Sequence, residues 1–192
     1  MRIAAIIGTA GRKEDAARLT PQLWGNVQDA FFALLQRRPY DVLVSGGAAW
    51  ADHLAVQAFN RGLVPELRLY LPAPWQGLGF RDTGGYGTAN PGGTTNYYHD
   101  KFSRALNIDS FEEIEAARVH GAKVEVDPGG FFGRNNLIAR DANEVIAFTF
   151  GTRHYHGPWI SADKAGLKDG GTAHTWSQCQ HVATAVHYCL GR

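Results

Sequence analysis

The chain has 192 residues, of which 44% are hydrophobic and 19% are charged. These proportions are typical of a globular protein and exclude a disordered or fibrous chain. The formal net charge is +1, so the sequence lacks the basic excess that holds duplex nucleic acid. We therefore expect one compact domain over residues 1–192, and we expect its ligand to be smaller than a nucleic acid.

The cysteine positions favour a cytoplasmic protein. Cys179 and Cys189 both fall in residues 173–190, which the apolar pattern predicts to be one closing helix. Ten helical residues separate the two positions by about 15 Å, which is too far for a disulfide. The apolar run at residues 2–7 is too short for a secretory signal, and no run of about 18 apolar residues predicts a membrane span.

Strands and helices are predicted to alternate in the first part of the chain. Apolar runs predict strands at 2–7 and 41–45, and residues 66–71, which end at Pro72, are predicted to be a third strand. Apolar residues recur every three or four positions at 20–35 and 51–61, which predicts two amphipathic helices between these strands. The first two strands end in glycine-containing turns, where the backbone can approach a ligand closely.

The sequence changes character after residue 75. Residues 76–96 lack periodicity and predict a long loop, in which Pro91-Gly92-Gly93 only turns the chain. A capping box at Asp109 predicts a helix that runs to His120. We expect residues 76–122 to be an insertion within the same domain.

The remaining elements complete a prediction of the fold. We expect strands at 123–126 and 144–150, a helix at 135–142, a loop at 151–171 and the closing helix. Strands that alternate with helices predict a Rossmann-like α/β fold, an open parallel sheet with helices on both faces. Ligands of such sheets bind beyond the carboxyl ends of the strands, which is where the glycine-rich turns fall.

The turn after the second strand has the sequence SGGAAWAD and is the clearest binding motif. Gly46 and Gly47 allow the backbone to approach a ligand, and Ser45 and Trp50 offer a hydroxyl group and an aromatic face. Asp52 begins the following helix, where it either contacts the ligand or complements the helix dipole.

Two further strand ends carry groups suited to an anion. Gly8 and Thr9 follow the first strand, and Arg12 adds a guanidinium to the same turn. Arg134 and Asn135 follow a loop of glycine and phenylalanine, and they offer a guanidinium and an amide. Asn135 is equally suited to cap its helix.

The start of the closing helix is a fourth candidate segment. It contains Gly170, Gly171, Thr172, His174 and Thr175. Backbone N–H groups and hydroxyls at a helix start bind anions, and a histidine titrates near neutral pH. The alternative is that Thr172 serves only as the N-cap of this helix and does not contact a ligand.

Metal binding is not expected, and neither is a cofactor. His154, His156 and His174 lack the spacing of a zinc site. Five aromatic residues near the expected strand ends are candidates to stack on a base, namely Trp50, Trp75, Phe132, Trp159 and Trp176. Because aromatic side chains more often pack in the core, we expect about two of these to contact a ligand.

Three segments resemble the SLOG superfamily of Rossmann-like nucleotide-binding proteins. They are SGGAAWAD at 45–52, RNNLIARDANEVIAF at 134–148 and GGTAHTW at 170–176. The superfamily includes LOG-type phosphoribohydrolases and the nucleic-acid-binding DNA-processing protein A, and the chain looks closest to a small bacterial and phage subgroup. The resemblance excludes residues 76–122. It implies a sensor or sequestering protein for a nucleotide or a nucleotide-derived signal, such as one like cyclic ADP-ribose.

The resemblance also implies an enzymatic alternative. LOG enzymes cleave the N-glycosidic bond of a nucleotide with an arginine, whose neighbourhood Arg134 matches, and with the glutamate of PGGxGTxxE. The position of that glutamate falls on Thr175, which cannot act as a carboxylate. Asp52 and His174 are then the remaining candidates for acid and base catalysis beside Arg134.

Some alternatives stay open at the level of sequence. Asp141 or Glu144 could replace the missing carboxylate as well as Asp52. Binding of single-stranded nucleic acid is a third function, against which the near-neutral charge argues. Whether the protein is an enzyme, whether it is a homo-oligomer and which base it binds are not decided by the residues.

Overall fold

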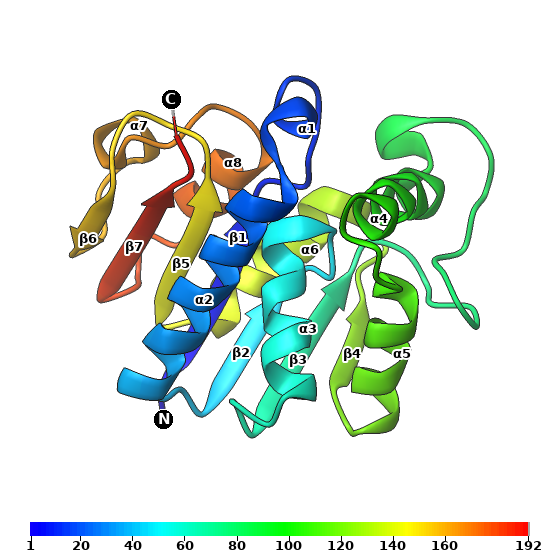
Figure 1. Ribbon diagram of the computed structural model, residues 1–192, viewed down its shortest axis with the longest axis horizontal. Helices are drawn as coiled ribbons and strands as arrows, with labels where there is room; N and C mark the ends of the chain where they lie inside the picture. Colours follow the sequence, from blue (N-terminus) through cyan, green and yellow to red (C-terminus); the bar gives the residue numbers. More distant parts are fainter. Residues whose placement is uncertain (192) are drawn as a thin grey trace.

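The computed structural model describes residues 1–191, through which one seven-stranded sheet runs in the order β4-β3-β2-β1-β5-β7-β6 (Figure 1). The parallel strands are β1 (Ile3–Gly8), β2 (Val42–Ser45), β3 (Glu66–Leu71), β4 (Lys123–Val126), β5 (Glu144–Thr149) and β7 (Thr184–Cys189). The short strand β6 (Tyr155–Gly157) pairs antiparallel with β7. The Rossmann-like α/β fold predicted from the sequence is confirmed.

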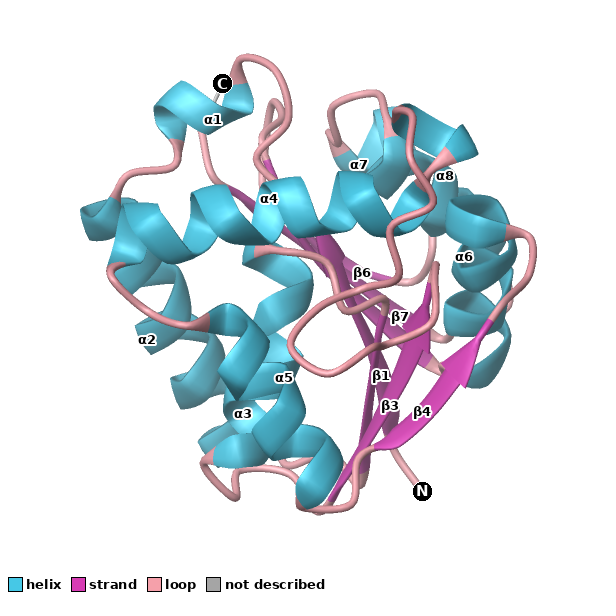
Figure 2. Ribbon diagram, turned by 90° about the vertical axis from the view of Figure 1, so that its right-hand side faces the viewer, coloured by secondary structure: helices cyan, strands magenta, loops and turns pink. Residues whose placement is uncertain are grey.

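Helices cover both faces of the sheet (Figures 1 and 2). One face packs against α2 (Pro21–Arg37), α3 (His53–Asn60) and α5 (Ser110–Val119). The other face packs against α6 (Gly130–Asp141), α7 (Ala162–Ala165) and α8 (Gly171–Gln178). Helix α4 (Pro91–Leu106) lies across the carboxyl edge of the sheet (Figure 2). Three short helices complete the chain: α1 (Asp15–Arg18), η1 (Trp50–Asp52) and η2 (Gly87–Ala89).

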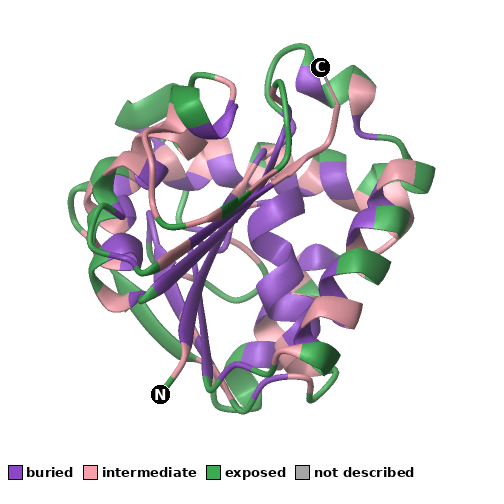
Figure 3. Ribbon diagram, turned by 90° about the vertical axis from the view of Figure 1, so that its left-hand side faces the viewer, coloured by how far each residue is buried: buried purple, intermediate pink, exposed green. Residues whose placement is uncertain are grey.

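The strands contribute alternate residues to two hydrophobic layers, because successive side chains of a strand point to opposite faces. In β1, Ala4 and Ile6 pack toward α2 and α3, whereas Ala5 and Ile7 pack toward α6 and α8. Figure 3 shows the buried residues concentrated along the strands and the inner sides of the helices. The central strands are therefore apolar on both faces, which explains their continuous apolar sequence.

The C-terminal segment differs from the sequence prediction. Helix α8 ends at Gln178, and residues 184–189 form β7, which pairs in parallel with β5. The predicted closing helix at 173–190 is therefore wrong beyond its first turns, because pairing with a buried strand outweighs a short apolar pattern that suits either structure. Cys179 and Cys189 do not share a helix, and both are free thiols.

The predicted long loops contain regular structure. Pro91 is in the first turn of α4, and the side chain of Asn90 accepts a hydrogen bond from the Gly93 N–H, so this sequence begins a helix. Residues 72–122 form the crossover from β3 to β4 through α4 and α5. The expected loop at 151–171 includes β6 and α7.

Helix α6 begins earlier than predicted. Gly130 is its first residue, so Arg134 and Asn135 lie in its second turn and Asn135 is not a cap. Both side chains therefore project from a regular helix, whose geometry fixes their positions. Among residues 1–191, none of the helices combines the length and the apolar character that crossing a membrane requires.

Candidate functional site

A cavity of about 560 Å³ opens at the carboxyl edge of the sheet. Gly8 at the end of β1 and Thr149 at the end of β5 both line it. These neighbouring strands mark the point where the strand order reverses, since β2, β3 and β4 lie on one side of β1 and β5 begins the other half. Ligands of open α/β sheets bind in the crevice at this point.

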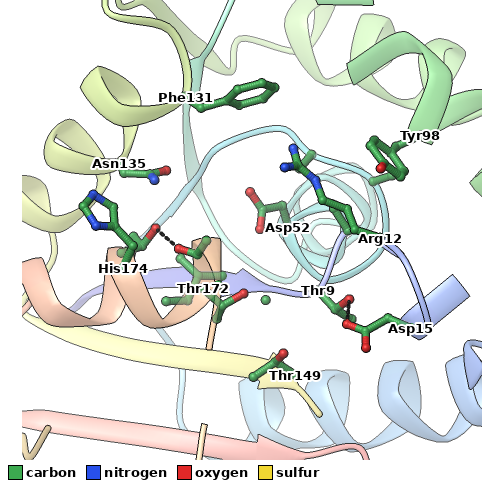
Figure 4. Close-up of a pocket in the computed structure, with 18 of the residues that line it drawn as sticks. Thr9, Arg12, Asp15, Asp52, Tyr98, Phe131, Asn135, Thr149, Thr172 and His174 are labelled. Carbon is green, nitrogen blue, oxygen red and sulfur yellow. Dashed lines mark hydrogen bonds between the residues drawn. The ribbon is translucent and has the colours of Figure 1, made fainter. Parts of the chain in front are cut away.

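Most of the residues predicted from sequence meet at this cavity, which Figure 4 shows in close-up. Those that line it are Gly8, Thr9, Arg12, Asp52, Arg134, Asn135, Gly170, Gly171, Thr172, His174 and Thr175. They come from the ends of β1 and η1, from the second turn of α6 and from the start of α8. Segments more than 150 positions apart in the sequence therefore share one site.

The two glycines and Ser45 of the turn after β2 do not line the cavity, whereas Ala48 and Ala49 of the same turn do, and the turn holds Asp52. Ser45 Oγ donates to the carbonyl oxygen of Asp52 at 2.9 Å, and the Gly46 N–H donates to Asp52 Oδ2 at 3.2 Å. A Cβ atom on Gly46 would lie 2.5 Å from Arg134 Nη1. Gly47 has a φ of 63°, in the left-handed region that favours glycine. The turn therefore positions a carboxylate instead of presenting its own N–H groups.

Trp50 also lies outside the cavity lining. Its indole is buried, with ring centroids 5.4 Å from Trp24 and 4.8 Å from Phe102. Its backbone φ of 62° is unusual for a bulky residue and persists only where the surrounding packing imposes it. Trp50 thus fixes the turn from the core side, below the cavity.

Asp52 and Arg134 form the central charged pair of the cavity. Asp52 Oδ2 lies 4.0 Å from Arg134 Nη1, and the Asp52 side chain points into the cavity (Figure 4). Burial raises the pKa of Asp52, while Arg134 and the N–H groups of Ala48, Gly46 and Gly8 act against this rise. Arg134 Nη1 donates to the Gly46 carbonyl oxygen, but the buried Arg134 Nε has no hydrogen-bond partner among residues 1–191.

Arg12 supplies a second guanidinium. Its Cζ atom lies 5.2 Å from the ring centroid of Tyr98 on α4 and 5.2 Å from that of Phe131 on α6. The Phe131 ring also lies 5.4 Å from Arg134 Cζ. Within the described part of the chain Arg12 forms no ion pair. Its positive charge is therefore held by aromatic faces and is available to an anion.

A second ionic cluster was not predicted from the sequence. Lys168 Nζ lies 2.8 Å from Asp15 Oδ1 and 2.5 Å from Glu14 Oε1, and Thr9 Oγ1 donates to Asp15 Oδ2 at 2.8 Å. All four residues line the cavity. Only the position of Asp15 shortly after the first glycine turn could have indicated it, because Lys168 lies far away in the sequence.

The start of α8 faces the same cavity. Gly170 precedes the helix with a φ of 138°, and no side chain caps the first turn, so Thr172 is not the cap. Thr175 Oγ1 donates to the Gly171 carbonyl oxygen at 3.0 Å, which uses its hydroxyl within the helix. The unpaired N–H groups of the first turn are the donors that remain for a ligand.

The other carboxylates considered in the sequence lie elsewhere. Asp141 accepts hydrogen bonds from Tyr70 and Arg68, and it does not line the cavity. Glu144 is the first residue of β5, at the amino edge of the sheet, where it binds Arg2. Asp52 is therefore the one of these three carboxylates that reaches the cavity.

Of the five aromatic candidates, Phe132 alone lines the cavity. Trp176 is buried in the core, where it accepts a hydrogen bond from Trp159 through its backbone, and Trp75 packs on Phe80. Across residues 1–191, no cluster of three or more histidine, cysteine or acidic side chains is arranged to hold a metal ion.

The chain is similar to a protein of Acanthamoeba polyphaga mimivirus named uncharacterized protein R261. The two are 33% identical over 184 residues, which cover 92% of this chain and 90% of the viral protein. No family model matches the chain. No solved structure matches it either.

Proposed function

This chain belongs to one family with the mimivirus protein R261, and from its cavity we propose that it binds a nucleotide or a nucleotide-derived small molecule. One observation carries this proposal. The cavity lies where the strand order reverses between β1 and β5, and two arginines from distant segments face it there. That position is the usual ligand site of open α/β sheets, and guanidinium groups are the preferred partners of phosphate.

The phosphate side of the ligand would contact Arg12 and the first turn of α8. Arg12 has no carboxylate partner among the described residues, whereas Arg134 shares its charge with Asp52. The N–H groups of Gly171 and Thr172 add uncharged donors that complement an anion. Arg12 is therefore the principal counter-charge for phosphate.

Asp52 is suited to hydroxyl groups. Its carboxylate lies in the middle of the cavity in Figure 4, between Arg12 and Asn135. A carboxylate accepts hydrogen bonds from the diol of a ribose, which is how many α/β folds hold a nucleotide sugar. A ligand with an anion at one end and a sugar in the middle therefore fits this distribution of groups.

The biological role that we propose is that of a sensor or sequestering protein of the SLOG type. The resemblance of the three segments at 45–52, 134–148 and 170–176 to that superfamily supports this role. The two free cysteines suit a reducing compartment, and we place the protein in the cytoplasm.

A second candidate function is hydrolysis of a nucleotide N-glycosidic bond. Its support is the carboxyl group of Asp52, whose raised pKa suits proton transfer and which faces the cavity beside Arg134. Water would add to the anomeric carbon while the carbon–nitrogen bond breaks and the base leaves with a proton. Arg134 would orient the phosphate, and Asp52 or His174 would move the protons.

The two functions are separated by one experiment on the purified protein. It is incubated with nucleoside monophosphates and with NAD-derived molecules, including ADP-ribose and cyclic ADP-ribose, while thermal stabilisation and release of free base are followed together. Stabilisation without release of base supports binding alone and contradicts hydrolysis. Release of base that disappears in Asp52→Ala and Arg134→Ala supports the enzyme.

Two outcomes would contradict the site. Release of base that survives both substitutions places the chemistry elsewhere. Absence of any thermal shift at millimolar concentrations of every nucleotide in the panel contradicts nucleotide binding.

A further inference from the structure

Asn135 is a buried polar side chain without a partner. It is 7% exposed and lines the cavity, yet its amide makes no hydrogen bond with any residue among 1–191. Figure 4 shows this amide pointing into the cavity from α6. The amide atoms are not enclosed by protein, so they meet the cavity instead of the core. Polar groups of largely buried residues are nearly always paired in native proteins, so this one is available to a ligand.

Phe132 stands next to Asn135 on the same side of α6. The two residues are three positions apart, which places them side by side on a helix. Phe132 lines the cavity although the residue is 58% exposed. Its ring centroid lies 5.4 Å from that of His174, at an angle of 88°. An exposed phenylalanine at a polar cavity is a surface on which a planar ring can stack.

These residues lie apart from the strongest positive charge. In Figure 4, Asn135 and His174 are on one side of the cavity, and Thr9, Arg12 and Asp15 are on the other. Asp52 and Thr172 lie between the two sides. The cavity therefore has a charged side and a side with an aromatic ring, an imidazole and a free amide.

We propose that Phe132, Asn135 and His174 form a subsite for the planar nitrogen heterocycle of the ligand. Phe132 stacks on the ring, His174 supports Phe132 by its edge contact, and Asn135 reads the edge of the base. An amide presents one donor and one acceptor side by side, and it pairs with a base edge on which a donor adjoins an acceptor. This assignment rests on the proposed nucleotide binding and adds the residues that select for a base.

The test compares ligands with and without a base. Dissociation constants of AMP, ADP-ribose and ribose 5-phosphate are measured by calorimetry for the wild type and for Phe132→Ala and Asn135→Ala. We expect Phe132→Ala to raise the dissociation constants of AMP and ADP-ribose by about 5- to 150-fold, the usual range for loss of one aromatic stacking contact. We expect Asn135→Ala to lower the affinity for AMP and ADP-ribose about tenfold. Ribose 5-phosphate should bind all three proteins equally.

The design contains its own controls. Asn136→Ala removes the same side chain from the neighbouring position, which is exposed and does not line the cavity, so it should leave all constants unchanged. Unchanged binding of ribose 5-phosphate shows that a variant has kept its fold. Phe132→Tyr keeps an aromatic face and should retain binding of AMP.

Each contrary result has a distinct meaning. Nucleotide binding that is the same in wild type, Phe132→Ala and Asn135→Ala overturns the subsite and leaves the proposed function intact. Wild-type binding of AMP that is no tighter than that of ribose 5-phosphate also overturns it, while an anion site remains. Failure of AMP, ADP-ribose and ribose 5-phosphate to bind overturns the subsite, and the proposed function falls with it when no other nucleotide of the panel stabilises the protein.

Discussion

Asp52 Oδ2 and Arg134 Nη1 are 4.0 Å apart, and the turn at Gly46 joins them by donating to the first residue and accepting from the second. The carboxylate comes from η1 on one face of the sheet and the guanidinium from α6 on the other face, and both line the cavity. Each is largely buried, with side-chain exposures of 12% and 7% for Arg134 and Asp52. Their mutual compensation is what allows both charges to remain at the site.

Removal of one partner should destabilise the protein. Asp52→Asn leaves the Arg134 guanidinium buried beside a neutral amide, and we expect a loss of about 2–4 kcal/mol in the free energy of unfolding. Urea denaturation followed by circular dichroism measures it. The double variant Asp52→Asn with Arg134→Met should recover part of the loss, because no uncompensated charge remains. Additive losses would show that the two side chains do not interact.

A glycine comparison tests the packing of the turn. Gly46→Ala would place a Cβ 2.5 Å from Arg134 Nη1 and 2.8 Å from Asp52 Oδ2, so we expect a loss of about 1–3 kcal/mol. Gly25→Ala is the matched control, because its Cβ in α2 would have no atom within 4 Å. There the substitution should stabilise the protein by about 0.5–1 kcal/mol, through better helix propensity. Equal effects of the two substitutions in urea denaturation would contradict the close packing at Gly46.

His99 should make stability depend on pH. Its Nε2–H donates to the Gly47 carbonyl oxygen at 2.9 Å, and Nδ1 accepts from Ser110 Oγ, so the ring is neutral and ties α4 to the glycine turn. Burial, aided by the nearby charge of His53, lowers the pKa of His99 to about 3 from its usual 6.5. Between these values the unfolded chain binds more protons, so stability falls as the pH falls from 6.5 toward 3.

The measurement is the difference between wild type and His99→Gln in the free energy of unfolding, taken at intervals from pH 7 to pH 4. The wild type should lose up to about 1.4 kcal/mol per pH unit more than the variant below pH 6.5. Asp52 contributes with the opposite sign, because a raised pKa favours the folded state at low pH, and its contribution cancels in the difference. Parallel curves would show that His99 titrates normally.

Arg12 should control the affinity for phosphate groups. We expect Arg12→Ala to raise the dissociation constant of the nucleotide that binds most tightly by about 10- to 100-fold, because the substitution removes a charge-assisted hydrogen bond. Arg12→Lys should restore only part of the affinity, because an ammonium group lacks the planar contacts with Tyr98 and Phe131. Calorimetry at two salt concentrations measures the dissociation constants of both variants.

The matched control for Arg12 is Arg104→Ala. Arg104 lies on α4, is 79% exposed in its side chain and pairs with Asp100, but it does not line the cavity. Its removal should change neither the affinity nor its dependence on salt. Equal weakening by the Arg12 and Arg104 substitutions would point to a general effect of charge instead of a phosphate contact.

The sheet and most of the cavity lining were predictable because they depend on local patterns. Apolar runs identify β1, β2 and β5, Gly8 ends the first of these strands, and the turn after the second carries Asp52. Parallel strands bring their carboxyl ends to one edge, so these residues meet without any further information. The roles within the glycine turn after β2 were not predictable, since they depend on how Asp52 folds back onto Gly46.

The parts that were missed depend on contacts between distant segments. The apolar residues of the C-terminal segment suit a helix as well as a strand. Their pairing with β5 is what makes residues 184–189 a strand, β7. The ion pair of Lys168 with Asp15 joins segments far apart in the chain, and no local sequence pattern around either residue predicts it. Helix α4 was not predicted because its first turn contains Pro91 and two glycines, a composition typical of loops.

Helix α4 has a consequence for how the ligand range of related proteins can diverge. It lies across the carboxyl edge of the sheet (Figure 2) and contributes Thr95 and Tyr98 to the cavity lining, to which the ends of β1 and β5 contribute Gly8 and Thr149. The strand ends are constrained by the sheet, whereas α4 belongs to a crossover that connects β3 to an exposed edge strand. Exchanging this crossover between homologues would therefore replace Thr95 and Tyr98 in the lining, while the sheet and the proposed base subsite of Phe132, Asn135 and His174 stay in place.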